Sequence, residues 1–494
     1  MAIKTVKITE FDGGITRDIR TQSTNKFKLS TNFDIFSDSK RMQPFRALEA
    51  NETKNINITQ FIQTNSQVYG FGTTVDTAIA KIYKKNGNLI TADWIEDRAV
   101  NGSGAREENV FFEYKDYLYF WEAGARLTRH GDITGTATNA TYQTIAYTNV
   151  AQPVHHPADD IAYFFSDNKV HKLNDTAWSL AALTLPDNLI ITSATAYGNY
   201  LAIGCKSTEI AGHSTVFLWD RDSSLTTISE KIDWGRGDLM ILNVLDGVLV
   251  GISNISTGFF GIKPKIHIKG YTGSLTFLQE LDVDSTTTGD EDYSIPDGAK
   301  GIIQNGKLYF PLHSNSATVP RNYTGIWVIG RHEVGSPFAA TMAYKVDTTD
   351  AIDTIEGFNI FEDYLWVAHS SDGSVDRIND QAGGSNESTA TYESYIFTGN
   401  NSEQTKKLIK VAVMTEPQPT AGTTKLEYKA DADSSWTTIF TNSTDDDIEH
   451  TAVNIEATGV NLREFKEVQF KITSTGGTVI TGFKFDYEEI NRGI

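Results

Sequence analysis

Lys115-Asp-Tyr-Leu-Tyr-Phe-Trp121 and Asp246-Gly-Val-Leu-Val-Gly-Ile252 decide the fold, because each joins a two-residue turn signal to a strongly apolar strand. The pattern occurs seven times, with its second turn residue at positions 66, 116, 160, 199, 247, 306 and 363. These positions are 39 to 59 residues apart, a spacing typical of propeller blades made of four short strands with variable loops. The repeats therefore predict an all-β chain with a β-propeller of about seven blades.

The turn residues and the strands that follow them predict hairpins. Asp246-Gly247 and Asn305-Gly306 suit a type I′ turn, in which both central residues need a positive φ. Six partner strands that alternate with period two follow the apolar strands, such as Ser214–Trp219. A single hairpin of this kind cannot cover its own apolar face, so we expect the units to pack side by side. The segment Arg41–Glu49, just before the first repeat, is a candidate for the strand that closes the ring with the last blade.

The composition changes after Asp380, where residues 381–388 are small and polar and include paired glycines, as expected for a linker. Short alternating segments follow and predict a compact β-sandwich. The six expected strands are Tyr392–Phe397, Leu408–Met414, Lys425–Tyr428, Trp436–Phe440, Val468–Ile472 and Ile480–Tyr487. We therefore expect an N-terminal extended segment over 1–48 that includes the candidate closing strand, a propeller over 49–380, and a linker with a β-sandwich over 381–494.

Charge and cysteine content narrow the function classes. A formal net charge of −20 argues against a protein that wraps nucleic acid, because neutralising phosphates requires clustered Lys and Arg. The acidic residues instead indicate a solvated surface or the wall of a conduit that must repel DNA. Cys205 is the one cysteine and is expected in a buried strand, which leaves no disulfide framework. We find neither a signal-peptide core nor an apolar window that approaches a membrane span, so we expect synthesis in a cytoplasm.

Several clusters resemble functional sites, and each has a simpler structural interpretation. His155-His156-Pro-Ala-Asp159-Asp160 is the densest group of metal-ligand side chains, but adjacent histidines on extended backbone point to opposite sides, so a blade-connecting turn is favoured. The acidic groups Asp282–Asp292 and Asp445–Glu449 lack the glycine-anchored spacing of a calcium loop. Arg236-Gly237-Asp238 matches an adhesion tripeptide that also occurs by chance, and a structural turn is the favoured interpretation.

We find no nucleophile elbow, no paired catalytic carboxylates and no histidine with a Ser or Cys partner. The segment Lys429–Trp436 is similar to the Asp-box turn of sialidases, yet it lacks the glycine and is expected to form a sandwich hairpin. Aromatic residues either line a sugar groove or pack blade against blade, and packing is favoured. These residues are Tyr117, Tyr119, Trp121, Tyr364 and Trp366. No catalytic, cofactor-binding or metal-binding residue is predicted, and no cofactor.

Both ends of the chain resemble a known protein class. The run Phe11-Asp-Gly-Gly-Ile-Thr16, followed by Leu29–Phe36 and Arg41–Arg46, is similar to the opening of tail and tail-tip structural proteins of tailed bacteriophages. The C-terminal run resembles the sandwich that follows the propeller in the same proteins. Its marks are Lys406–Val413, Lys425–Lys429, Phe465–Ile472 and Gly482–Tyr487.

The resemblance implies a virion structural protein of a phage tail, either a nozzle or a tail-tip component, without enzymatic activity. It also implies contacts with other tail proteins, a homo-oligomeric ring, and proximity to DNA in a channel without sequence-specific binding. No membrane span is expected. A receptor-binding or carbohydrate-binding propeller module is the alternative, and a propeller glycoside hydrolase is the third. The hydrolase requires carboxylates about 5 to 10 Å apart at one end of the propeller channel.

Overall fold

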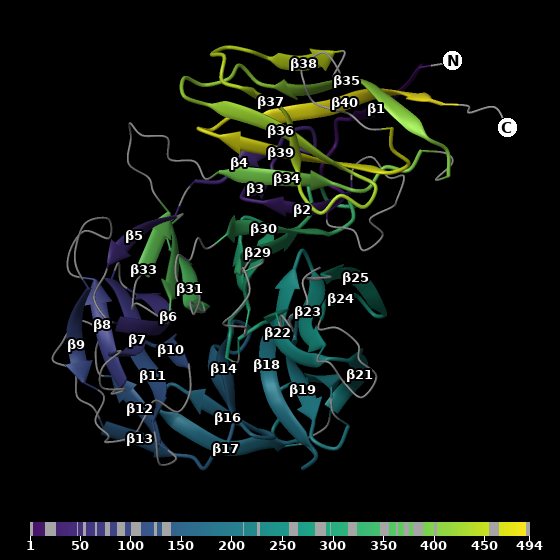
Figure 1. Ribbon diagram of the computed structural model, residues 1–494. Helices are drawn as coiled ribbons and strands as arrows, with labels where there is room; N and C mark the ends of the chain where they lie inside the picture. The colour runs from purple at the N-terminus through teal and green to yellow at the C-terminus, as the bar shows by residue number, and fades with distance from the viewer. Residues whose placement is uncertain are drawn as a thin grey trace. The chain divides into compact units, whose positions relative to one another are not determined.

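The computed structural model is an all-β fold made of many small sheets, which confirms the predicted class and its propeller-like character (Figure 1). It describes residues 3–14, 26–46, 48–52, 56–64, 67–74, 80–85, 94–99, 110–122, 126–130, 140–210, 212–224, 228–255, 265–281, 293–296, 298–314, 324–345, 355–361, 364–369, 375–378, 389–399, 403–453 and 464–490. These residues contain no helix, and so none that is long and apolar enough to cross a membrane.

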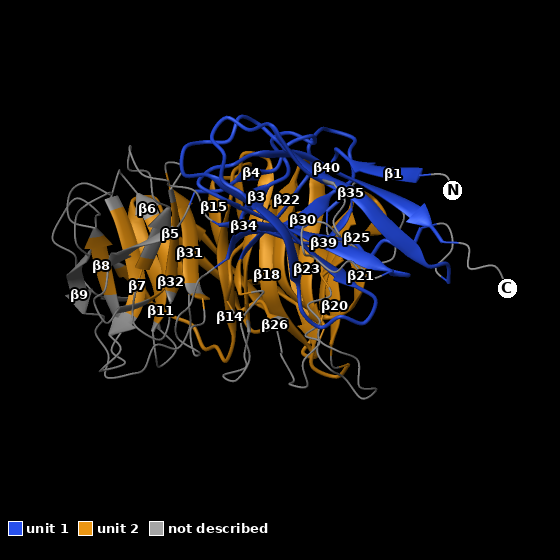
Figure 2. Cartoon of the chain, turned by 45° about the horizontal axis from the view of Figure 1, so that its top comes forward, with its two compact units in different colours: residues 1–48, 326–346, 378–494 blue, residues 49–325, 347–377 orange. Residues whose placement is uncertain are grey.

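The chain divides into two compact units (Figure 2). Unit 1 comprises residues 1–48, 326–346 and 378–494, and unit 2 comprises residues 49–325 and 347–377. Unit 1 therefore combines both ends of the chain with a segment from its middle. Unit 2 contains all the apolar repeats.

Unit 2 consists of consecutive antiparallel sheets, most of them four-stranded. The first three are β6 (Ile56–Thr64), β7 (Gln67–Thr74), β8 (Ala80–Lys85) and β9 (Trp94–Ala99); β10 (Phe111–Tyr114), β11 (Tyr117–Glu122), β12 (Arg126–His130) and β13 (Ala140–Thr144); and β14 (Val150–His156), β15 (Ile161–Ser166), β16 (Lys169–Asn174) and β17 (Ala177–Thr184). The next two are β18 (Leu189–Tyr197), β19 (Tyr200–Ser207), β20 (His213–Trp219) and β21 (Ile228–Arg236); and β22 (Asp238–Leu245), β23 (Val248–Ile255), β24 (Lys265–Tyr271) and β25 (Leu275–Leu281). They are followed by β28 (Lys307–Ser314), paired with β26 (Tyr293–Ser294) and β27 (Ile302–Gln304), and by β31 (Ile355–Phe361), β32 (Tyr364–His369) and β33 (Val375–Ile378).

The last sheet of unit 2 is completed by a strand from near the N-terminus. β5 (Leu48–Glu52) follows β33 in the order β31-β32-β33-β5. The predicted closing segment, Arg41–Glu49, overlaps this strand only at its end. Its earlier residues are used elsewhere: Met42 forms a bridge with Ile480, and β4 (Gln43–Pro44) pairs with β3 (Phe33–Asp34). The strand that completes this sheet therefore begins later in the chain than the predicted closing segment.

The turns predicted as type I′ have positive φ at both central residues, whereas at 159–160 and 198–199 only Asp160 and Gly198 do. Asp246 and Gly247 have φ values of 50° and 78°, and Asn305 and Gly306 have values of 50° and 69°. Each turn joins the first strand of a sheet to the second, and the apolar repeat is the second strand. The turns at 65–66 and 362–363 lie outside the described residues. Positive φ at both positions is what a type I′ turn requires.

The apolar second strands pack against neighbouring sheets. Trp121 and Tyr119 of β11 belong to a cluster with Ala162 and Phe164 of β15 in the next sheet. This confirms that these aromatic side chains pack between sheets, as expected. A second cluster joins β15 to β19 and includes Cys205, whose side chain is fully buried, as predicted. Burial raises the pKa of the Cys205 thiol.

Unit 1 contains two main sheets and the small β3–β4 pair. One sheet has the order β1 (Ile3–Ile8), β40 (Ile480–Glu489), β35 (Lys406–Thr415) and β38 (Glu449–Val453). The other runs through β29 (Gly325–Gly330), β30 (Ala339–Lys345), β2 (Phe27–Thr31), β34 (Ala390–Ser394), β39 (Val468–Thr475), β36 (Thr423–Ala430) and β37 (Thr437–Asn442). All six strands expected after residue 388 are present, and β38 is additional. Phe470 of β39 lies 4.8 Å from Phe483 and 4.9 Å from Phe485 of β40, so aromatic rings join the two sheets.

Candidate functional site

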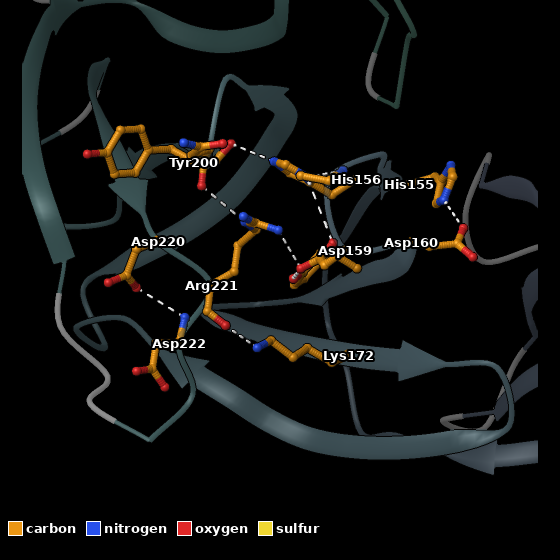
Figure 3. A network of polar contacts seen from close by, with 12 residues as sticks. His155, His156, Asp159, Asp160, Lys172, Tyr200, Asp220, Arg221 and Asp222 are labelled. Atoms are coloured by element: carbon orange, nitrogen blue, oxygen red, sulfur yellow. Dashed lines mark hydrogen bonds and ion pairs between the residues drawn. The ribbon is translucent and has the colours of Figure 1, made fainter.

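The predicted cluster His155–Asp160 lies at the turn between β14 and β15, at the centre of a network of polar contacts (Figure 3). β14 ends at His156, residues 157–160 form the turn, and β15 begins at Ile161. The turn therefore joins two strands of the same sheet, whereas the sequence favoured a turn between blades. A short hairpin turn places its polar residues at the end of its sheet. There they can contact residues at the ends of the neighbouring sheets.

The two adjacent histidines have different partners, as expected for extended backbone. His155 Nε2 lies 2.8 Å from Asp160 Oδ1, whereas His156 Nε2 lies 3.1 Å from the carbonyl oxygen of Tyr200 in the next sheet. The backbone N–H of Ala158 donates to His156 Nδ1 at 3.3 Å, so His156 is the neutral tautomer with its proton on Nε2. Burial, and then the nearby Arg221, lowers the pKa of His156.

Asp159 and Arg221 connect the sheet of β14 to the sheet of β18. Arg221 Nη1 lies 2.5 Å from Asp159 Oδ2, and Tyr163 donates to the same oxygen at 2.7 Å. Arg221 Nε donates to the carbonyl of Asn199 at 3.1 Å. Lys172 donates to the carbonyl of Arg221 and places its ammonium group 5.0 Å from the ring centroid of Trp219. The Arg221–Asp159 ion pair and the hydrogen bonds to backbone carbonyls thus hold the loop after β20 against the turn after β14.

Lys115 makes a corresponding connection on the other side, to the sheet of β10. Its ammonium group pairs with Asp160 and lies 3.3 Å from Asp175 Oδ1. Hydrogen bonds to these two carboxylates, first Asp160 and then Asp175, raise the pKa of Lys115 to about 12. Tyr114 strengthens the connection by donating to the carbonyl of Asp160 at 2.8 Å. The cluster therefore joins three consecutive sheets at one end.

The partners of these side chains point to a structural role. His156 Nδ1 lies 3.8 Å from Asp159 Oδ1, whereas His155 pairs with Asp160 and Asp159 pairs with Arg221, so their contacts are divided among several protein groups. Within the described part of the chain, no group of three or more His, Cys, Asp or Glu side chains is arranged to hold a metal ion. The ion pairs and hydrogen bonds of this cluster hold the loops of neighbouring sheets in place.

The other predicted clusters lie in separate places. Asp282–Asp292 is outside the described residues. Arg236-Gly237-Asp238 links β21 to β22, and Gly237, with φ 109°, donates its N–H to the carbonyl of Gly212 at 2.7 Å. Lys429–Trp436 spans the end of β36 and the connection to β37, which pair as a hairpin as predicted. Of the aromatic residues considered for a sugar groove, Trp366 is buried in unit 2, and the side chain of Tyr364 is outside the described set.

Replacing Arg221 by methionine is expected to lower the free energy of unfolding by about 2 kcal/mol, because it leaves the half-buried Asp159 carboxylate without its cation. Asp159→Asn should cost a similar amount, and the double variant should cost less than the sum. The coupling, about 1 kcal/mol or more, is measured by urea unfolding of all four proteins.

The exposed pair of Lys466 and Glu403, 3.0 Å apart, provides the control for this cycle. Lys466→Met should change the free energy of unfolding by less than about 0.5 kcal/mol, since exposed ion pairs contribute little. Strict additivity of the Asp159 and Arg221 substitutions would show that the two side chains do not act together.

No family model matches this sequence, and no curated protein matches it. Among solved structures, the extracellular domain of a protein described as a one-component system of B. thetaiotaomicron is similar over 74% of this chain, at 12% identity and a TM-score of 0.34. This chain spans about half of that chain, 53% of its length. A similarity at this level carries no argument about the function of the chain.

Proposed function

We propose that this chain is a non-enzymatic structural protein of a bacteriophage tail, a nozzle or tail-tip component of the virion that contacts neighbouring tail proteins and forms a ring of copies. Its unit 2 is a seven-bladed β-propeller, and its unit 1 contains a C-terminal β-sandwich. DNA passes near it without sequence-specific binding.

The observation that carries the proposal is the placement of the segments that resemble phage tail proteins. They lie at opposite ends of the sequence, yet β2, which includes Leu29–Thr31, and β39, which includes Val468–Ile472, are the two neighbours of β34 in one sheet of unit 1. Met42 of the run Arg41–Arg46 also bridges Ile480, the first residue of β40, and β40 contains the run Gly482–Tyr487. Runs from opposite ends of the sequence that meet in one sheet form a single structural unit, which supports treating both as parts of one resemblance.

The contacts among the first strands of the sheets support a closed ring in unit 2. β18 lies against β14 and β22, β10 lies against β6 and β14, and β31 lies against β6. β28 lies against β22 and β31, so it occupies the remaining position between the fifth sheet and the last. A ring of sheets leaves few exposed strand edges, which is an advantage for a protein packed at high local concentration.

The charge of the chain is compatible with a position beside DNA. At −20, its summed charge opposes phosphate groups, so DNA that passes it is not retained. The polar cluster around His155 and Asp159 binds neighbouring sheets rather than a substrate, which agrees with a scaffold role.

The test is the protein content of gradient-purified particles from a lysate in which this chain is expressed from its own gene. Quantitative mass spectrometry should find several copies per particle, and antibody labelling in electron micrographs should lie on the tail. Particles that lack the chain would overturn the proposal. A glycan array on the purified chain addresses the receptor-binding alternative, because a scaffold should leave the array unbound.

A further inference from the structure

The outer face of one sheet in unit 1 carries a cluster of lysines around a tryptophan, which we call the Lys–Trp face. Register places Glu427 of β36 opposite Lys471 of β39, and Lys471 opposite Glu393 of β34. Trp436 directly precedes β37 and lies with its ring centroid 4.8 Å from the ammonium nitrogens of both Lys429 and Lys471. The face comprises Lys28, Glu393, Lys425, Glu427, Lys429, Trp436 and Lys471.

The Lys–Trp face is positive in a chain of net charge −20. Glu427 is shared by Lys425 and Lys471, each 2.7 Å away, and Lys28 lies 3.8 Å from Glu393. Among the described residues, Lys429 has no carboxylate within ion-pair distance. Four lysines against Glu393, Glu427 and the nearby Asp433, whose charge also acts on Lys429, leave an excess of one positive charge beside a partly exposed indole. Such a surface matches a partner that brings carboxylates together with an apolar side chain.

Unit 1 itself presents that combination in the turn between β37 and β38, which we call the acidic turn (residues 443–448). Asp445 and Asp446 are exposed and have no side-chain partner among the described residues, while Ile448 between them and β38 is 60% exposed. Asp447 points inward instead, where its Oδ2 accepts from Asn442 Nδ2 at 2.8 Å. This bond fixes the turn, so two free carboxylates and one apolar side chain are held outward.

We propose that the acidic turn of one copy docks on the Lys–Trp face of a second copy. The inference rests on the ring of copies in the proposed function and names its contact. Trp436 lies just before β37, and the acidic turn lies just after it. The six residues of β37 separate them by about 20 Å, so the acidic turn of a copy cannot bind the Lys–Trp face of the same copy. Two different patches joined head to tail make a heterologous interface, which generates rings or filaments.

Analytical ultracentrifugation of the full chain tests the contact. The wild type should self-associate at low salt and dissociate as salt is raised, since the pairs are exposed to screening. Lys429→Glu combined with Trp436→Ser alters the face, and Asp445→Lys combined with Ile448→Ser alters the turn. Each double variant should weaken association at least tenfold. Lys7→Glu combined with Ile3→Ser is the matched control on β1, where both side chains are exposed, and it should associate like the wild type.

A mixture of the two variants separates a specific contact from a general defect. The face variant retains its turn and the turn variant retains its face, so an equimolar mixture should form dimers and nothing larger. Melting temperatures close to that of the wild type verify folding. A wild type that stays monomeric, or variants that still form the full oligomer, would overturn the inference. So would a Lys–Trp face that binds polygalacturonate or duplex DNA while the protein remains monomeric. The proposed function is tested separately, by whether mass spectrometry detects the chain in purified particles, so either proposal can fail without the other.

Discussion

Gly357→Val is expected to lower the free energy of unfolding by more than about 3 kcal/mol, because this position in β31 has no room for a side chain. A Cβ added to Gly357 would lie 2.5 Å from the carbonyl carbon of Thr59 and 3.0 Å from the backbone nitrogen of Gln60. Both atoms belong to β6, the first strand of the first sheet, and backbone atoms cannot move aside like the end of a flexible side chain. The substitution therefore acts where the last sheet meets the first.

Chemical unfolding followed by tryptophan fluorescence measures this effect, and Gly357→Ala should give a smaller loss in the same direction. Gly198→Ala is the control, since nothing lies within 4 Å of its added Cβ and its φ is 57°. Its cost should be about 1 kcal/mol, from the backbone conformation alone. Equal losses for Gly198→Ala and Gly357→Val would mean that β31 and β6 are not closely packed.

Local signals made part of this fold predictable. The apolar second strands and their Asp-Gly and Asn-Gly turns are recognisable because the turn requires positive φ and the strand is buried on both faces. The outer strands are harder to see. β17 is mostly exposed over Ala177–Ala181, so its sequence lacks a regular apolar alternation. β38 was missed for a similar reason: it is an edge strand of five residues, Glu449–Val453.

Long-range pairing was beyond the reach of the sequence pattern. The strand signal at Ile3–Ile8 is clear, but nothing local specifies that its partner is β40 at the other end of the chain. The same limit shifted the closing strand from Arg41–Glu49 to Leu48–Glu52, since both segments have strand character and only pairing distinguishes them. At the candidate site, the opposed directions of His155 and His156 were predictable from backbone geometry. The partner Arg221 was missed, because it lies 62 positions after Asp159 in a loop without a motif.

Acidification from pH 7 to pH 4 is expected to destabilise the wild type by up to about 3 kcal/mol more than a His171→Gln variant. His171 in β16 is buried and fully bonded as a neutral ring: Ala181 N–H donates to Nδ1 at 3.1 Å, and Nε2 donates to Ser166 Oγ, 2.9 Å away. Burial, and then the charge of Lys169, lowers the pKa of His171 to about 4. A cation at this position would lose the bond from Ala181, and among the described residues the one charge that acts on it is the like charge of Lys169.

The sign follows from the proton balance. The unfolded histidine has a pKa of about 6.5, so between pH 6.5 and pH 4 the unfolded chain binds a proton that the folded chain does not. Stability is therefore intact above pH 6.5, falls as the pH is lowered through this window, and levels off below the folded pKa. Glutamine does not titrate, so subtracting its urea-unfolding curves removes every other ionisable group, including His156 and His267, whose pKa values burial also lowers. A difference between the two proteins that stays constant from pH 7 to pH 4 would show that His171 is protonated as readily in the folded chain as in the unfolded one.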